Sequence, residues 1–437
     1  MRKELKEAIA SYRSLKSAKE GSREWHAWKC MNENVTYRLD QAASNQATIG
    51  LRVLIRVLRK MRSGTDAFHT LRGEPQLAIL ESAFVFEELE FEYVKKQAQP
   101  PGVFFSQEDL PAAFKGQQLI PFILFALPIV LSCFFSSANR ANKAMHIAFV
   151  AENAALLHLV RSQKIKRIFD FAPYLIDHNW SYLLLENELD DFTKLPSPGP
   201  LSTHHGVLYC HSLLLSSAYQ KEEIKVLKEV KYTQVDMWVP EYAFTYIDRY
   251  LETLPEPEPM TIGYYSHGGW LRRDEGHTDD GLNIPEAEEQ LLKDLAKFTA
   301  EHDGWKVMIF PHPREKKPEL VEKTREFYQQ FFPDGNFALA GPDVRTSMSF
   351  EHVDIAAAAF STILYERLFC GYKTLIGNYG MEHFPMKGST LDGICFNSGE
   401  QLSKKLLELE SVTRNEFFER YGLEAYRFDA YPYFVQA

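Results

Sequence analysis

Side chains that could bind a phosphate stand directly after two apolar segments of the chain, residues 305–310 and residues 354–360. Apolar runs of this length suit buried strands, and ligands of a parallel sheet lie beyond the carboxyl ends of the strands. The residues that follow the two segments are His312, Pro313 and Arg314 after the first and Ser361 and Thr362 after the second. Imidazole, guanidinium and hydroxyl donors at one edge of a sheet predict a site for a diphosphate or a nucleoside monophosphate.

A helical stretch and a third strand belong to the same set. Residues 363–370 have a helical pattern and contain Glu366, and residues 260–265 form another apolar strand. Three further candidates for nucleotide binding follow that strand: Ser266, His267 and Gly268. Helix N-termini behind such strands offer unpaired N–H groups to anions, so we expect backbone amides to contribute to the site.

The elements that must position these residues follow an α/β pattern. From residue 75 onward, short apolar runs alternate with helical stretches, which is typical of βαβ units on a parallel sheet. Beside the three strands above, strands are expected at 76–80, 102–105, 166–171, 212–216 and 374–377, and a helix at 144–161. The acidic, proline-rich run 254–259 can continue neither a helix nor a central strand and marks a domain boundary. The expected parts are a helical extension at 1–72, α/β domains at 73–254 and 260–420, and a segment at 421–437 that returns to the first domain.

Composition limits the class of protein. The net charge of −10 is a poor match for a nucleic-acid backbone, so no nucleic-acid partner is expected. Five cysteines without any CxxC pair indicate reduced thiols and no zinc framework. The polar N-terminus lacks the apolar core of a signal peptide, which predicts a cytoplasmic protein.

Two segments suggest contact with a membrane surface. Residues 47–63 form a basic amphipathic helix, which suits either packing on the protein with a solvated basic face or docking on anionic lipid. Residues 119–135 carry no charge but contain two prolines, and the run is shorter than the ~20 residues of a membrane-spanning helix. We therefore expect peripheral attachment to the inner face of the cytoplasmic membrane, with a buried helix pair as the alternative.

The ordered motifs resemble those of GT-B glycosyltransferases, in which two Rossmann-like domains face each other across a cleft. A His-Pro pair after one strand and a Ser-Thr pair after a later strand resemble the arrangement of bacterial sialyltransferases and of Kdo and CDP-glycerol transferases of surface-polymer assembly. The resemblance covers roughly residues 260–400. It implies two facing Rossmann-like domains, with the helical extension in front of them.

The resemblance also implies roles for individual residues. Glu366 would face the ribose hydroxyls, and Ser361 and Thr362 would face the phosphate. His312 would donate to the leaving nucleotide as its charge develops, so that no metal ion and no cofactor are expected. The implied activity is an inverting transfer of a sugar from a CMP-sialic acid or CMP-Kdo type donor to a glycan or lipid-linked acceptor.

The sequence departs from the sialyltransferase pattern in its acidic motif. The Asp-Asp-Gly triplet stands at residues 279–281, inside the second domain, whereas those enzymes carry theirs in the first. As a general base we expect Asp177, just beyond the strand 166–171, or His205 in a turn-rich loop. Residues 279–281 also suit a solvated turn.

Other interpretations of the same residues stay open. A His-Pro pair by itself often only terminates a strand, and loop histidines such as His205 and His267 are often satisfied locally. No carboxylate spacing around them supports a metal site. Two further functions fit the motifs: polyol-phosphate transfer from a CDP donor, and a non-catalytic GT-B-like partner in a polysaccharide assembly complex.

Overall fold

The protein is described by a computed structural model of 437 residues. The residues that it describes are 2–32 without 26 and 30, then 55, 59, 69–70, 77–81, 102–106, 124, 140–170, 179–194, 201, 208–215, 217–226, 230–231, 234–237, 257–274, 284–344 without 334, then 346, 349–380 without 360, and 388–428. The chain divides into two compact units. Unit 1 holds residues 1–197, 201–215 and 224–238, and unit 2 holds residues 198–200, 216–223 and 239–437.

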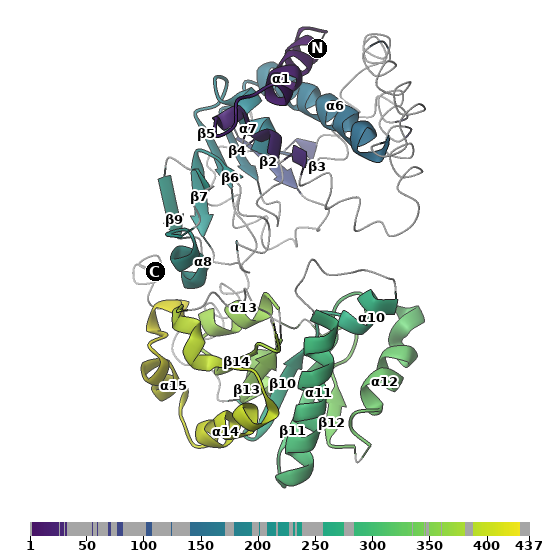
Figure 1. Cartoon of the computed structure of the whole chain (residues 1–437), viewed down its shortest axis with the longest axis vertical. Helices are drawn as coiled ribbons and strands as arrows, with labels where there is room; N and C mark the ends of the chain where they lie inside the picture. The colour runs from purple at the N-terminus through teal and green to yellow at the C-terminus, as the bar shows by residue number, and fades with distance from the viewer. Residues whose placement is uncertain are drawn as a thin grey trace. The chain divides into compact units, whose positions relative to one another are not determined.

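Unit 1 is built on a seven-stranded sheet in the order β1-β3-β2-β4-β5-β7-β9. Its strands are β1 (His69–Thr70), β2 (Leu77–Glu81), β3 (Gly102–Ser106), β4 (Arg167–Asp170), β5 (Asp191–Lys194), β7 (Ser212–Leu215) and β9 (Gln234–Met237). A separate parallel pair joins β6 (Leu208–Tyr209) and β8 (Val230–Lys231). The helices are α1 (Arg2–Lys16), α6 (Arg140–Gln163) and α7 (Asn179–Leu185), and α1 packs along α6 (Figure 1).

All neighbouring strands of the unit 1 sheet are parallel except β1, which pairs with β3 in the antiparallel direction. The strands expected at 76–80, 102–105, 166–171 and 212–216 are confirmed as β2, β3, β4 and β7, and the helix expected at 144–161 as α6. The periodicity of residues 1–72 predicts helices only, so β1 corrects it at His69–Thr70. That strand is too short to show an alternating pattern.

Unit 2 is built on a six-stranded parallel sheet in the order β12-β11-β10-β13-β14-β15. Its strands are β10 (Thr261–Tyr265), β11 (Lys306–Phe310), β12 (Phe337–Leu339), β13 (Ile355–Ala358), β14 (Thr374–Gly377) and β15 (Cys395–Phe396). Its longer helices are α10 (Gly269–Asp274), α11 (Ile284–Glu301), α12 (Val321–Gln329), α13 (Ile363–Phe369), α14 (Gly399–Leu409) and α15 (Arg414–Tyr421). The four strands expected from the sequence in this unit are confirmed as β10, β11, β13 and β14.

Both large sheets are Rossmann-like. In unit 2 the chain starts at β10, proceeds outward to β11 and β12, and then returns to the other side of β10 to form β13. In unit 1 the parallel strands start at β2, with β3 on one side and β4 on the other, while β1 is added antiparallel beside β3. Each reversal creates a switch point at the carboxyl ends of the strands, where ligands of open α/β sheets bind.

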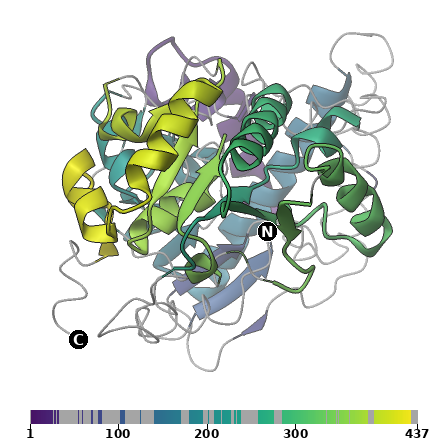
Figure 2. The ribbon, with the colours of Figure 1, turned by 90° about the horizontal axis from the view of Figure 1, so that it is seen from below.

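The unit 2 sheet is covered on its faces, so its central strands are apolar throughout. Every residue of β10, β13 and β14 is buried, including the run of alanines in β13. Helices α11 and α14 lie side by side over the sheet in Figure 1 and again in the view from below in Figure 2. Strands buried on both faces show continuous apolar runs instead of an alternating pattern. For this reason they could be recognised in the sequence.

Helix α8 (Ala218–Glu223) belongs to unit 2, although the strands before and after it belong to unit 1. The Glu222 carboxylate accepts hydrogen bonds from the backbone and side chain of Thr390, and the Tyr426 hydroxyl donates to it at 3.2 Å. Residues 421–428 thus pack within unit 2, and residues 429–437 lie outside the described part of the chain. The domain limits expected from the sequence stay predictions.

The two segments expected at a membrane lie almost entirely outside the described residues. Ile55 and Arg59 of the first and Leu124 of the second are helical and exposed. Among the described residues, no helix is both long and apolar enough to cross a bilayer. The peripheral attachment stays a prediction.

Candidate functional site

The candidate site is formed by the loops that follow β10, β11 and β13. These strands are neighbours and parallel, so their carboxyl ends meet at one edge of the unit 2 sheet. The rings of His267 and His312 lie 5.9 Å apart, centroid to centroid. A Cβ on Gly268 would be 3.5 Å from the imidazole of His312. The first two loops are therefore in direct contact.

The loop after β10 uses its backbone amides internally. The N–H groups of His267 and Gly269 donate to the two carboxylate oxygens of Glu288, at 2.5 and 2.6 Å, and the N–H of Gly268 donates to the Ser266 hydroxyl at 2.9 Å. Contrary to the expectation from sequence, these three amides are not unpaired donors. An anion at this loop would be bound by side chains.

Gly268 is a glycine for a conformational reason. Its φ of +77° lies in the left-handed region, where a side chain is strained. The conformation allows the loop to turn directly from β10 into α10. An added Cβ would meet His312 at 3.5 Å, an ordinary van der Waals distance, so the positive φ and not a lack of space disfavours a side chain here.

Glu315 joins the loop after β11 to the neighbouring helices. Its side chain is fully buried and accepts hydrogen bonds from the His312 N–H at 2.6 Å, from the Tyr328 hydroxyl at 3.0 Å and from the indole N–H of Trp270. The Thr324 hydroxyl donates to the Glu315 carbonyl at 3.0 Å. One carboxylate thus connects α10, the β11 loop and α12.

The imidazole of His312 has one ring nitrogen occupied. Its Nδ1 accepts the N–H of Arg314 at 3.2 Å. Because a nitrogen that accepts a backbone N–H carries no proton, neutral His312 has its proton on Nε2. No hydrogen bond within the described residues uses Nε2. This atom is the donor that the ring can offer to a ligand.

Electrostatics keep both histidines neutral. Burial, followed by the charges of Arg272, Arg314 and Lys316, lowers the pKa of His312 to about 4. Burial and the charges of Arg272 and His312 lower the pKa of His267 well below its usual value. At neutral pH each ring can therefore act as a hydrogen-bond donor that carries no charge of its own.

The two glutamates respond to burial in the opposite direction. Burial and the charge of Glu315 raise the pKa of Glu288 to about 7, against the opposing effect of its amide bond from His267. Burial also raises the pKa of Glu315. The Tyr264 hydroxyl donates to Glu288 at 3.1 Å and adds to this buried polar network. The two carboxylates hold the backbone of both histidine loops by accepting the N–H groups of His267, Gly269 and His312.

The loop after β13 carries the third group of expected residues. Ser361 is half-buried and Thr362 is exposed, and within the described residues their hydroxyls make no hydrogen bond. Glu366 lies further along α13 and is half-buried. The hydroxyl pair thus follows β13, next to the switch point between β10 and β13, and its contact with a phosphate stays a prediction.

Arg367 fixes the position of α13 against the sheet. Its side chain is 0% exposed, and its guanidinium donates to the carbonyls of Phe350, Val353, Asp354 and Lys373, at 2.6 to 3.2 Å. It also donates to the Tyr265 hydroxyl at the end of β10. These contacts tie the start of β13 and the end of β10 to one side chain.

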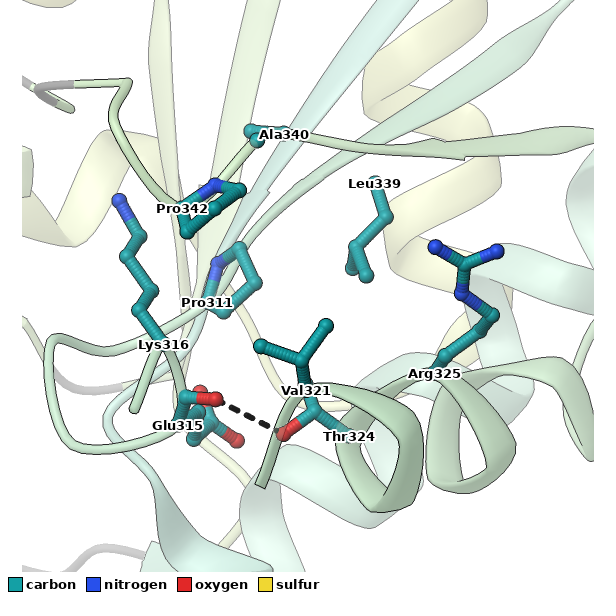
Figure 3. A pocket seen from close by; sticks show the side chains of 10 residues that line it. Pro311, Glu315, Lys316, Val321, Thr324, Arg325, Leu339, Ala340 and Pro342 are labelled. Carbon is teal, nitrogen blue, oxygen red and sulfur yellow. Dashed lines mark hydrogen bonds between the residues drawn. The ribbon is translucent and has the colours of Figure 1, made fainter. Parts of the chain in front are cut away.

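A pocket opens beside the His312 loop, between the ends of β11 and β12 and helix α12 (Figure 3). Its apolar wall is formed by Pro311, Val321, Leu339, Ala340 and Pro342. Lys316 and Arg325 stand at opposite sides of it (Figure 3). The Lys316 amine donates to the Val344 carbonyl at 2.7 Å.

The structure brings most of the expected residues to one edge but does not describe all of them. Asp177, His205 and residues 279–281 lie outside the described residues, so their roles stay predictions. Among the residues that are described, no group of three or more His, Cys, Asp and Glu side chains could hold a metal ion.

Sequence reasoning missed the two buried glutamates. Glu315 had a local signal, because a Glu three residues after His312 matches the spacing of a capping box. One half of a capping box is present, because the His312 N–H donates to the Glu315 carboxylate; the Glu315 N–H donates to the backbone carbonyl of His312 at 2.8 Å, as in a turn, and not to its side chain. Glu288 had no local signal, since its partners are 19 and 21 residues away.

Comparisons with known proteins find similarity of structure only. No family model matches the chain, and no curated protein matches its sequence. A glycosyltransferase from Rickettsia africae has a TM-score of 0.42 at 10% identity, covering 80% of this chain and 93% of its own. A UDP-GlcNAc 2-epimerase from Methanocaldococcus jannaschii has a TM-score of 0.43 at 9% identity, covering 78% and 95%. The wall teichoic acid polymerase TagF has a TM-score of 0.39 at 11% identity, covering 88% and 93%. At these values the similarities assign no function to the chain.

Proposed function

We propose that this protein is a glycosyltransferase that uses a nucleotide-activated sugar, with the nucleotide bound at the carboxyl edge of the unit 2 sheet. The observation that carries the proposal is the state of His312. Its ring is neutral, its Nδ1 is occupied by the Arg314 N–H, and its Nε2–H stands at a switch-point edge next to a second histidine loop. This arrangement suits a hydrogen-bond donor to the leaving phosphate, whose negative charge increases as the glycosidic bond breaks.

The chemistry follows from the charge on the leaving group. When the glycosidic bond to the nucleotide breaks, its electron pair and the resulting negative charge pass to the phosphate oxygen. A fixed neutral donor near that oxygen stabilises the transition state more than the ground state, because the charge is greater there. His312 Nε2–H would supply this hydrogen bond, and the hydroxyls of Ser361 and Thr362 would hold the phosphate.

The nucleoside would bind in the pocket beside the His312 loop, at the same edge of the sheet. The pocket beside His312 has two prolines in its wall and cations at its sides, a combination that suits the flat face of a base and its attached phosphate. Pro313 and Arg314 lie in the chain between His312 and the pocket residue Glu315. Glu366 would accept the ribose hydroxyls, as the sequence motifs imply.

The acceptor and the general base would come from unit 1. The candidates Asp177 and His205 follow β4 and precede β6 in the chain, and they are proposed for this role from sequence alone. The sugar would be of the sialic acid or Kdo type, activated as a CMP derivative, and the product would belong to a cell-surface polysaccharide or lipid-linked glycan. Polyol-phosphate transfer from a CDP donor uses the same His-Pro edge and is the alternative; a GT-B-like partner without turnover is the other.

Nucleotide binding is the first test. Thermal unfolding should be recorded with CMP, CDP, UDP and GDP, since a ligand at 100 times its Kd stabilises the folded state by about 2.7 kcal/mol. We expect stabilisation by a cytidine nucleotide. If none of the four nucleotides stabilises the protein, the proposal is wrong.

Kinetics of His312→Ala with the matching donor provide the second test. Loss of one preorganised donor should lower kcat by ~10²-fold to 10³-fold while nucleotide affinity changes much less. His352→Ala is the matched control, because His352 is exposed and precedes β13 at the opposite edge of the sheet. If the His312→Ala enzyme turns over at the parental rate, His312 has no role in catalysis and only terminates the strand.

A further inference from the structure

We propose that Glu315 is a positioning residue: its buried carboxylate holds the turn that fixes His312 in the Nε2–H tautomer. The inference deepens the proposed function at the same site, and its kinetic arm rests on that function. Glu315 is 0% exposed and both of its carboxylate oxygens accept hydrogen bonds from protein donors, so we assign it to the positioning of His312 and not to contact with the substrate.

The first support is the reciprocal bonding within the turn. The Glu315 carboxylate accepts the N–H of His312 at 2.6 Å, while the Glu315 N–H donates to the His312 carbonyl at 2.8 Å. Closing the turn at both ends places the N–H of Arg314 against Nδ1 of His312. The ring then has Nε2 as its protonated nitrogen. The tautomer therefore depends on the geometry of this turn.

The second support is how the carboxylate itself is held. Its other oxygen, Oε1, accepts from the hydroxyl of Tyr328 on α12 at 3.0 Å and from the indole of Trp270 on α10. Both donors come from helices that lie outside the turn. The turn is thereby anchored to two rigid elements instead of moving with its own loop.

The third support is the chemical identity of the side chain. Among the described residues Glu315 forms no salt bridge, so its carboxylate is held by neutral donors at the cost of desolvation. Both oxygens accept, one from the His312 backbone and one from the two helices. A glutamine would place an NH₂ group against one of these donor sets. Only a side chain with two acceptor oxygens can accept hydrogen bonds from both sets of donors.

The test compares Glu315→Gln with Thr324→Val. The glutamine variant keeps the volume but breaks one side of the carboxylate contacts. The valine variant removes the bond to the Glu315 carbonyl and leaves the carboxylate contacts intact, which makes it the matched control. Imidazole ¹⁵N shifts of His312, identified by its loss in His312→Ala, report the tautomer without any substrate.

We expect the parent and Thr324→Val to show a protonated Nε2 and an unprotonated Nδ1 at pH 7. Glu315→Gln should show averaged shifts from both tautomers, and its kcat should fall roughly 10-fold to 100-fold with little change in KM. Unchanged ¹⁵N shifts in a folded Glu315→Gln protein would overturn the proposal.

If Glu315→Gln does not fold, Tyr328→Phe removes one donor to Oε1 and must shift the His312 tautomer in the same direction; unaltered shifts would again overturn the proposal. If the tautomer responds as expected but no nucleotide binds the parent protein, the inference about Glu315 stands and the proposed function fails. The two ideas therefore fail separately.

Discussion

A Cβ atom on Gly269 would lie 2.5 Å from Oε2 of Glu288, the oxygen to which the Gly269 N–H donates at 2.6 Å. The same atom would lie 2.8 Å from Cα of Pro285. Backbone and carboxylate can approach this closely only because the residue has no side chain. The contact fixes the start of α10 against α11, and with it the loop that carries His267.

Gly269→Ala should therefore destabilise the protein by about 1–3 kcal/mol, the usual cost of forcing atoms into a packed site. Urea unfolding would measure the change. Gly341→Ala is the control, because the nearest atom to its added methyl is 3.7 Å away. Equal stability of the two variants would show that Glu288 moves aside without cost.

Glu288 should make stability depend on pH between about 4.5 and 7. Its pKa in the folded protein is raised to about 7 from a usual value of 4.5. A group with a raised folded pKa stabilises the protein below its unfolded pKa, and that stability is lost as the pH rises through the folded pKa. The loss should reach roughly 3 kcal/mol. In Glu288→Gln, urea unfolding at pH 4.5 and pH 8 should lack this component of the difference; an identical pH slope in both proteins would contradict it.

His146 should produce the opposite dependence in unit 1. Burial, followed by the charge of Lys16, lowers its pKa to about 4, and its Nδ1 is bonded to the Tyr12 hydroxyl at 3.1 Å. A lowered folded pKa gives stability that is present above about 6.5 and lost as the pH falls toward 4.

The size of this effect should be up to roughly 3 kcal/mol. Exchange of the backbone amides of α1 and α6, recorded at pH 7 and pH 5 with correction for intrinsic rates, would detect it as weaker protection at pH 5. His146→Gln should remove most of the difference. Equal pH dependence in His146→Gln and the parent would assign the effect to other groups.

Arg367→Met should be among the most damaging single substitutions in unit 2. The change leaves buried carbonyls of residues 350, 353, 354 and 373 without their donor, and each unpaired group costs about 1–3 kcal/mol. We expect a loss of roughly 3–5 kcal/mol in urea unfolding. Arg325→Met is the control, because Arg325 is exposed. A loss below that of the control would mean that water replaces the guanidinium.

Four of the six strands of the unit 2 sheet, and the residues at their carboxyl ends, could be predicted from the sequence alone. Strands β10, β13 and β14 are buried along their whole length, and β11 is buried apart from the exposed Lys306 and the half-buried Met308. They therefore appear in the sequence as short, mainly apolar runs that end at polar residues. The polar residues at the strand ends include His312, Ser361 and Thr362. They were predicted to lie together because the carboxyl ends of parallel strands meet at one edge of the sheet.

Strand β5 was not recognisable, because its residues include Asp191, Thr193 and Lys194. Its place in the middle of a sheet depends on a partner 24 residues earlier: the Lys194 amine donates to the Asp170 carboxylate at 2.8 Å, and both side chains are buried. Paired charges can be buried where single ones cannot. Such pairing cannot be read from a local pattern.

The contacts that hold the histidine loops could not be predicted from the sequence and appear only in the folded chain. In the sequence Glu288 belongs to the charged residues of an amphipathic helix, and Glu315 follows a His-Pro turn. Folding buries both carboxylates and surrounds them with backbone N–H, hydroxyl and indole donors from other elements. The propensity and periodicity of a segment describe its own backbone, whereas the protonation state of His312 depends on neighbours that the fold brings from elsewhere in the chain.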